Sequence, residues 1–236
     1  MQLDPLFIIE AFVDILQALP LTLVISVVPL LFGFVIGIGI ALIRIYKVKG
    51  IHHLAAFYVS FIRGTPLLLH IMIIYFGVPL LFDNLAETYG WNVRSSVIPL
   101  VAFILVAFSI NSGAYMSEAI RSGILSVNRG QLEAAYSVGM TTWQGIRRIV
   151  LPQALMGSLP NLLHKFIGLL HGSSLAFTIS LEDLNGRANI VATSNLKFLE
   201  AFIAAAFIYW GLTLLAEQLT SLLEKRLNVY NRGGVA

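Results

Sequence analysis

The chain has 236 residues, of which 58% are hydrophobic and only 11% are charged. About a quarter of the residues of ordinary soluble domains are charged, so this composition predicts an integral membrane protein. The absence of cysteine excludes a disulfide framework, a thiolate metal site and a cysteine nucleophile. We attribute the net charge of +3 to membrane topology rather than to nucleic-acid binding, because few basic residues cluster on any soluble segment.

The N-terminal segment, residues 1–18, is acidic and carries Asp4, Glu10 and Asp14. It lacks the basic start and the small-residue cleavage site of a signal peptide. We therefore expect it to remain in the mature chain and to lie at the membrane interface.

Five apolar segments are long enough to cross a bilayer core of about 30 Å, which needs roughly 20 helical residues. These segments are 19–43, 54–80, 97–120, 149–179 and 199–222. In the first of them, Gly33, Gly37 and Gly39 favour close packing against another helix. The chain is thus expected to form one all-helical transmembrane domain over residues 19–226, followed by a cytoplasmic tail over residues 227–236.

The basic residues indicate the orientation, because short cytoplasmic loops retain lysine and arginine. Most of them follow the first, third and fifth predicted spans: Arg44, Lys47, Lys49, Arg121, Arg129, Arg147, Arg148, Lys225, Arg226 and Arg232. The opposite loops hold only Arg94, Arg187 and Lys197, among a larger number of acidic residues. This bias predicts an N-terminus outside the cell and a cytoplasmic C-terminus.

Two basic residues, Arg63 and Lys165, fall inside predicted spans. A charge within a span is costly and usually faces a bundle interior or a water-filled cavity, which makes both residues functional candidates. The alternative for each is a structural ion pair, or a side chain that reaches out to the membrane surface.

The segment 129–152, between the third and fourth spans, is polar and helix-forming. Gly139 interrupts its first helical stretch at a position where a turn with positive φ is easy, and Thr141 or Thr142 can cap a second stretch. Pro152 can begin the following span. We expect a helix–turn–helix hairpin on the cytoplasmic face, which is either a docking surface or a linker without a partner.

Seven positions of this segment match the pattern Glu-Ala-Ala, three residues, Gly, nine residues, Ile, one residue, Leu-Pro. They are Glu133, Ala134, Ala135, Gly139, Ile149, Leu151 and Pro152. The pattern resembles the signature loop of the membrane-spanning subunits of bacterial ABC importers. Other stretches are similar to the polar amino-acid uptake permeases of that group: "FIRGTPLLLHIMIIYFGVP", "INSGAYMSEAIRSGI" and "HKFIGLLHGSSLAFTI".

The resemblance implies a type I ABC importer permease fold, with five transmembrane helices and a cytoplasmic coupling-helix hairpin, in a bacterial cell membrane. It also implies a second permease chain, two ATP-binding subunits and an extracytoplasmic solute-binding protein as partners. The residues expected to couple to the ATPase are Glu133, Ala134, Ala135, Gly139, Arg147, Leu151 and Pro152. The chain has no Gly-Lys dipeptide, and therefore no phosphate-binding loop, so ATP and Mg²⁺ are expected to bind a partner subunit and no cofactor to bind this chain.

A polar stripe on the fourth span marks the candidate substrate path. Lys165, Gly168 and Gly172 lie within about 20–40° of Asn161 around an ideal helix. Lipid cannot satisfy such a stripe, which should therefore face protein or water. The full set of candidates is Asn161, His164, Lys165, His171, Ser173, Ser174, Asn111, Tyr115, Arg63 and Thr65.

The expected cargo follows from a departure from the family pattern. Cationic amino-acid members typically have Glu where this chain has Lys165, and Lys-Asp where it has His171-Gly172. A site with a lysine and two histidines disfavours arginine, lysine and histidine as cargo and suits carboxylates. The stretches "SLAFTI" and "FIAAAFIYWG" look most like the cystine or sulfur amino-acid branch, and glutamine, glutamate or another polar amino acid is the alternative.

The alternatives are three other classes of membrane protein: an intramembrane enzyme, an ion-coupled carrier and a channel. An intramembrane enzyme would need a nucleophile–base pair or a metal cluster, and the five histidines show no ligand spacing with acids. An ion-coupled carrier would usually show inverted repeats and broken helices in both halves. A channel would have no use for the cytoplasmic hairpin.

Overall fold

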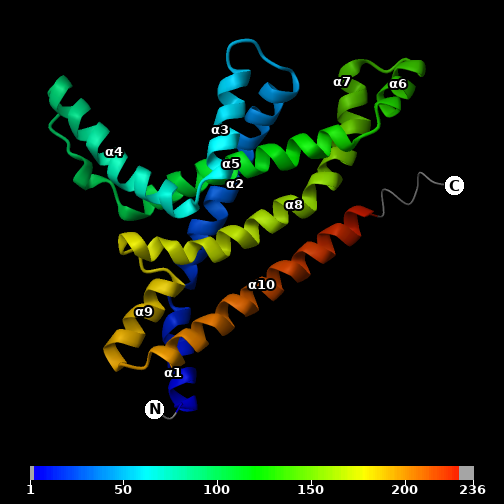
Figure 1. Cartoon of the computed structure of the whole chain (residues 1–236). Coiled ribbons are helices and arrows are strands. Elements are labelled where there is room, and N and C mark those ends of the chain that lie inside the picture. Colours follow the sequence, from blue (N-terminus) through cyan, green and yellow to red (C-terminus); the bar gives the residue numbers. More distant parts are fainter. Residues whose placement is uncertain (1–2, 229–236) are drawn as a thin grey trace.

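The structure, a computed structural model, describes residues 3–228, and all regular structure in that range is helical (Figure 1). Residues 229–236, which hold most of the predicted tail and Arg232, lie outside the described residues. The ten α-helices of the described range are α1 (Pro5–Leu16), α2 (Leu19–Ile45), α3 (His52–Gly64), α4 (Leu67–Tyr89), α5 (Leu100–Ser126), α6 (Arg129–Ser137), α7 (Thr142–Gly145), α8 (Leu151–Gly172), α9 (Leu184–Asn195) and α10 (Phe198–Asn228).

Five helical segments are long and apolar enough to cross a membrane, which confirms the predicted all-helical class with five spans. They are Leu19–Ile45, Leu67–Tyr89, Leu100–Ser126, Thr142–Ile179 and Phe198–Leu222. The fourth is composite: α7, a π-helical turn at Ile146–Val150, α8 and a short 3-10 helix at Ser173–Ile179 follow one another without a gap.

The second span is not the one that the sequence predicts. A continuous helix over 54–80 is wrong, because the helix ends at Gly64 and a new one begins at Leu67. Pro66 disfavours helical backbone at the residue before it, and Thr65 is extended, with φ −124° and ψ 150°. The crossing segment therefore begins at Leu67, and Arg63 lies in the last turn of α3 rather than inside a span.

Helix α5 is the centre of the fold and packs against α2, α3, α4 and α8. Its contact with α2 is close because two glycines of α2 leave no side chain in the way. A Cβ added at Gly37 would lie 2.8 Å from the Cβ of Met116, and one added at Gly33 would lie 2.9 Å from the Oγ of Ser112. The predicted packing role is thus confirmed for Gly33 and Gly37. It is wrong for Gly39, where an added Cβ meets nothing within 4 Å.

The N-terminal helix α1 packs against α9 and α10 and shares a small core with them. Two ion pairs hold it there: Asp14 with Arg187 at 2.6 Å, and Asp4 with Lys197 at 2.6 Å. Asp4 and Asp14 therefore have basic partners within the chain. Its place at the membrane interface stays a prediction.

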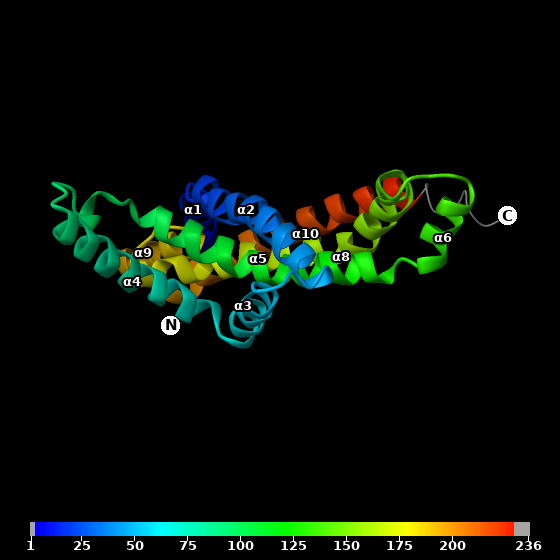
Figure 2. The ribbon, with the colours of Figure 1, turned by 90° about the horizontal axis from the view of Figure 1, so that it is seen from above.

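The molecule is flat and open rather than compact (Figures 1 and 2). In both views, the outer end of α4 and the hairpin formed by α6 and α7 lie on opposite sides, and Figure 1 shows α1 and α9 at a third end. Only 11% of the α4 crossing segment is buried, against 61% for α5. Most of the α4 surface is thus left for lipid or for another chain to cover.

Candidate functional site

A cleft of about 450 Å³ opens between α3, α5 and α8. Its walls combine charged and polar side chains with small residues: Arg63, Tyr115, Glu118, Ala119, Ser122, Asn161, His164, Lys165 and Gly168. Because α5 and α8 are crossing segments, this is a polar hollow along membrane-spanning helices. Polar surface at that depth is stable only against water, cargo or other protein.

Lys165 is the most strongly held cation of the cleft. Its Nζ donates a hydrogen bond to Oδ1 of Asn111 at 2.6 Å and lies 4.2 Å from the centre of the Tyr115 ring. The guanidinium of Arg63 lies 5.6 Å from the same ring centre. Two cations thus share one aromatic platform, which stabilises both without neutralising either.

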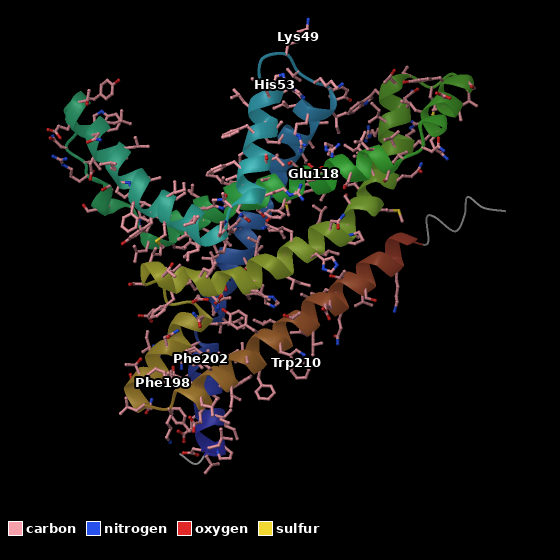
Figure 3. All side chains as sticks on the ribbon, in the orientation of Figure 1. Lys49, His53, Glu118, Phe198, Phe202 and Trp210 are labelled. Atoms are coloured by element: carbon pink, nitrogen blue, oxygen red, sulfur yellow. The ribbon has the colours of Figure 1, made fainter. Side chains whose placement is uncertain are left out.

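Glu118 is the acidic side chain of the cleft lining and projects from α5 near α2 and α3 (Figure 3). It pairs with Arg44 at 2.6 Å, with Arg121 one turn further along α5, and with Arg63 at 3.9 Å. Three arginines therefore pair with one carboxylate, and Lys165 lines the same cleft. The excess positive charge makes the cleft suited to an anionic group.

A chain of polar groups, of which Asn111 and His70 are buried, continues from Lys165 away from the cleft. Nδ2 of Asn111 lies 3.2 Å from Nδ1 of His70, and Nε2 of His70 lies 2.7 Å from Oγ1 of Thr65. The Thr65 hydroxyl in turn donates to the carbonyl of Phe61 at 2.7 Å. The chain thus links the cleft to the break between α3 and α4.

The structure brings together seven of the ten predicted substrate-path residues. Arg63, Tyr115, Asn161, His164 and Lys165 line the cleft. Asn111 contacts Lys165 directly, and Thr65 joins it through His70.

Three of the predicted residues lie outside the lining of this cleft, and their place in a substrate path stays a prediction. His171 hydrogen-bonds to Thr213 of α10 at 2.8 Å, and Ser174 donates to the carbonyl of His171 in its own turn. Ser173 is buried and donates to Asp183 at 3.2 Å. They lie at the α10 side of the fourth span, where residues from Ser173 onward are in a 3-10 helix.

Sequence reasoning missed Glu118, Ser122 and His70. Glu118 lies inside the predicted third span, and the rule that marked Arg63 and Lys165 applies equally to an acid. His70 and Ser122 carry no comparable signal, because a neutral polar residue on a membrane helix can face any neighbour.

The predicted hairpin is present, with the expected turn chemistry. Asn128 caps α6 by accepting from Gly130 N at 2.8 Å, and Thr141 caps α7 in a reciprocal capping box with Gln144. Between the two helices Gly139 has φ +80°, a left-handed conformation that suits glycine. Gly139 N and Met140 N donate back to the carbonyls of Tyr136 and Ala135, which closes the end of α6.

One face of the hairpin packs inward and the other is open. Ala135 and Gly145 are buried, and a Cβ added at Gly145 would lie 2.8 Å from Leu132. The other predicted coupling residues are exposed: Glu133, Ala134, Gly139, Arg147, Leu151 and Pro152. Val138 and Trp143 add apolar surface at exposures of 75% and 69%. Charged and apolar groups presented together are typical of a protein docking surface.

Within residues 3–228, no three His, Asp or Glu side chains come together as candidate metal ligands.

The family model described as "Binding-protein-dependent transport system inner membrane component" matches residues 31–229 of the chain. The chain is similar to a Bacillus subtilis (strain 168) protein named "Probable amino-acid permease protein YxeN", with 38% identity over 94% of the chain and 95% of that protein. It is also similar to "L-cystine transport system permease protein TcyL" of the same organism, with 40% identity over 92% of the chain and 88% of that protein. A solved structure titled "Crystal structure of an amino acid ABC transporter with histidines" matches with a TM-score of 0.81 and 34% identity, over 96% of this chain and 100% of the other.

Proposed function

The chain belongs to the family of binding-protein-dependent transport system inner membrane components, and from this premise we propose that it imports L-cystine or a related sulfur amino acid. It is a multi-pass permease of the amino-acid ABC transporter type. Support for a cystine-like cargo comes from the similarity to TcyL and from the excess positive charge of the cleft. That charge is the observation on which the choice of cargo class rests.

We propose that Lys165 and Arg63 receive a carboxylate of the cargo. Both cations line the cleft on the Tyr115 platform, and Glu118 is already engaged by arginines. An amino acid with a positively charged side chain would meet repulsion there, whereas cystine balances its two amino groups with two carboxylates. Glutamate and glutamine fit the same charge pattern and are the second candidates.

The work of transport is divided among several chains in this proposal. Two ATP-binding subunits bind ATP and Mg²⁺ and hydrolyse it, and this chain is not itself an enzyme. A second permease chain, identical or related, covers the open side of the cleft within the membrane lipid. A solute-binding protein delivers the cargo from outside, on the side of the N-terminus, and the C-terminus is cytoplasmic.

Coupling passes through the hairpin of residues 129–152 in this account. Its exposed residues Glu133, Ala134, Gly139 and Arg147 meet the ATP-binding subunit, with Ala135 holding α6 on α7 from the buried side. Helical structure then runs without a gap from Thr142 to Gly172. A displacement of α7 is therefore transmitted through Leu151 and Pro152 to Asn161 and Lys165, which opens the cleft alternately to the two sides.

Uptake by proteoliposomes tests the cargo assignment. The chain is reconstituted with its ATP-binding subunits and solute-binding protein, and labelled cystine is offered with competing amino acids. We expect ATP-dependent uptake that arginine does not inhibit. Better uptake of glutamine or glutamate than of cystine would select the second candidates. Uptake that needs an ion gradient instead of ATP would indicate a secondary carrier and contradict the proposal.

The same assay tests the carboxylate site. Lys165→Ala should raise the half-saturating cargo concentration about 10- to 100-fold, because a hydrogen bond to a charged group contributes roughly 1.5–3 kcal/mol. Lys165→Arg keeps the charge and should retain most of the affinity. Equal affinities in the wild type and Lys165→Ala would show that Lys165 is structural.

A further inference from the structure

We propose that His70 is a positioning residue, which fixes the amide of Asn111 so that its oxygen faces Lys165 and holds the ammonium in the cleft. The observation that carries this is the continuous series of hydrogen bonds from Lys165 to Phe61. The inference deepens the proposed function, because it rests on Lys165 meeting a carboxylate of the cargo.

The direction of every bond in the series follows from its two ends. Lys165 can only donate, so the atom of Asn111 that lies 2.6 Å from its Nζ must be the amide oxygen. Nδ2 of Asn111 is then a donor, and Nδ1 of His70 has to accept from it. The proton of a neutral His70 ring is therefore on Nε2.

The other end requires the same tautomer. The Thr65 hydroxyl donates its one proton to the carbonyl of Phe61 at 2.7 Å. Its oxygen is left to accept, and Nε2 of His70 lies 2.7 Å away as the donor. Donors and acceptors match at each link only when His70 carries its proton on Nε2.

Burial removes water as a substitute for His70. His70 is 4% exposed and Asn111 is 3% exposed, so few solvent molecules can reach the amide. Without an acceptor at Nδ1, the Asn111 NH₂ group would lose its partner, and a reversed amide would present NH₂ to the ammonium. Either arrangement costs free energy, since a buried polar group without a partner is expensive.

The position of the Lys165 ammonium depends on the side-chain amide of Asn111. Asn111 is the hydrogen-bond acceptor that the described part of the chain gives Lys165, whose other close contact is the face of the Tyr115 ring. His70 comes from α4, Asn111 from α5 and Lys165 from α8. The position of the cationic group is thus set jointly by three crossing helices and by the break at Thr65.

Two substitutions separate positioning from simple packing. In His70→Asn the side-chain oxygen can occupy the place of the ring Nδ1, because both atoms are bonded to Cγ. This variant therefore keeps an acceptor for the NH₂ group of Asn111. His70→Leu fills the site with an apolar side chain and removes the acceptor. His53→Leu, which removes an exposed histidine at the start of α3 (Figure 3), is the matched control.

The assay is ATP-driven cargo uptake by the reconstituted complex, with half-saturating concentration and maximal rate measured separately. We expect His70→Leu to raise the half-saturating concentration about tenfold, with a maximal rate within about twofold of the wild type. His70→Asn should recover most of the affinity, and His53→Leu should match the wild type. An unchanged affinity in His70→Leu, or an equal loss in both His70 variants, would overturn the proposal.

A spectroscopic measurement is independent of the cargo. The ¹⁵N spectrum of the complex with labelled histidine in this chain should contain a His70 signal pair with a bare Nδ1 and a protonated Nε2, assigned by its loss in His70→Asn. Asn111→Asp should place a proton on Nδ1, because a carboxylate only accepts. A His70 ring protonated on Nδ1 in the wild type would overturn the inference. Failure of the wild type to carry any amino acid would overturn the proposed function. The ¹⁵N spectrum would still decide which tautomer His70 adopts.

Discussion

At the scale of single residues, Asp183 shows how the fold holds a carboxyl group in a buried, hydrogen-bonded site. The side chain is fully buried and caps α9 by accepting from Gly186 N at 2.9 Å. Its other oxygen accepts from the hydroxyls of Tyr209 and Ser173. Burial raises the pKa of Asp183 above its ordinary 3.8, against the opposing effect of these hydrogen bonds.

The raised pKa predicts a pH-dependent contribution to stability. The folded chain keeps the Asp183 proton to a higher pH than the unfolded chain does, so stability falls as the pH rises from about 3.8 through the raised pKa. Asp183→Asn does not titrate and should lose this fall, whereas Asp183→Ala should cost about 1–2 kcal/mol through the lost cap. Thermal unfolding in detergent between about pH 4 and pH 7 measures both effects. Parallel pH profiles for the wild type and Asp183→Asn would show that the carboxylate does not carry the effect.

Only some residues of the site could be predicted from the sequence. Lys165 and Arg63 could be predicted because charge among apolar residues is conspicuous. His171 could not be placed, since six residues put it about 240° around the helix from Lys165, and helical angle alone does not say which neighbour covers each face. From Ser173 the chain tightens to a 3-10 helix, so a 3.6-residue projection no longer applies to Ser173 and Ser174.

At the scale of whole elements, the close contact of α2 with α5 depends on small residues at particular turns. Gly37 lies against Met116 and the backbone of Ser117, whereas Gly39 faces open space. The two glycines belong to one helix and are two residues apart, which makes them a matched pair for substitution.

Gly37→Ala should destabilise the protein by about 1–3 kcal/mol, because the added methyl group must force the two helices apart. Gly39→Ala should be neutral, or stabilising by up to about 1 kcal/mol, because alanine favours the helix and meets nothing. Thermal unfolding of both variants in the same detergent gives the comparison. Equal losses in the two variants would mean that the α2–α5 contact is looser than described.

Element boundaries were predicted less well than the existence of the spans. Pro29, Pro79 and Pro160 all lie inside helices, whereas Pro66 marks the break between α3 and α4. Membrane helices tolerate proline when neighbours satisfy the freed carbonyls, so a proline in an apolar run does not by itself indicate an end. Here the Thr65 hydroxyl satisfies the Phe61 carbonyl at the end of α3, a contact that cannot be seen in the sequence.

At the scale of the whole molecule, a single chain leaves large apolar side chains uncovered. Phe76 on α4 is 66% exposed, and Trp210 on the outer side of α10 is 60% exposed (Figure 3). The polar cleft is also open at one side, although it runs along membrane-spanning helices. Lipid can cover the aromatic surface but cannot satisfy the cleft, which supports the proposed second permease chain.

The global architecture was the most predictable part. Hydropathy gave five spans, and the seven-position pattern of the hairpin led to the family that the comparisons show. The packing between helices could not be predicted from the sequence, because lipid-facing and protein-facing apolar residues have the same composition in a membrane chain. This is why the cleft required the structure, whereas the hairpin did not.

The claim that energy enters through the hairpin is tested most directly by charge reversal at Glu133. Glu133 is exposed on α6, and Glu87 is an exposed glutamate near the end of α4, at the other end of the molecule (Figures 1 and 2). In the reconstituted complex, ATP hydrolysis stimulated by cargo-loaded binding protein is measured together with uptake. We expect Glu133→Lys to insert normally but to lose both activities, and Glu87→Lys to retain them. Full stimulation and uptake in Glu133→Lys would contradict coupling through the hairpin.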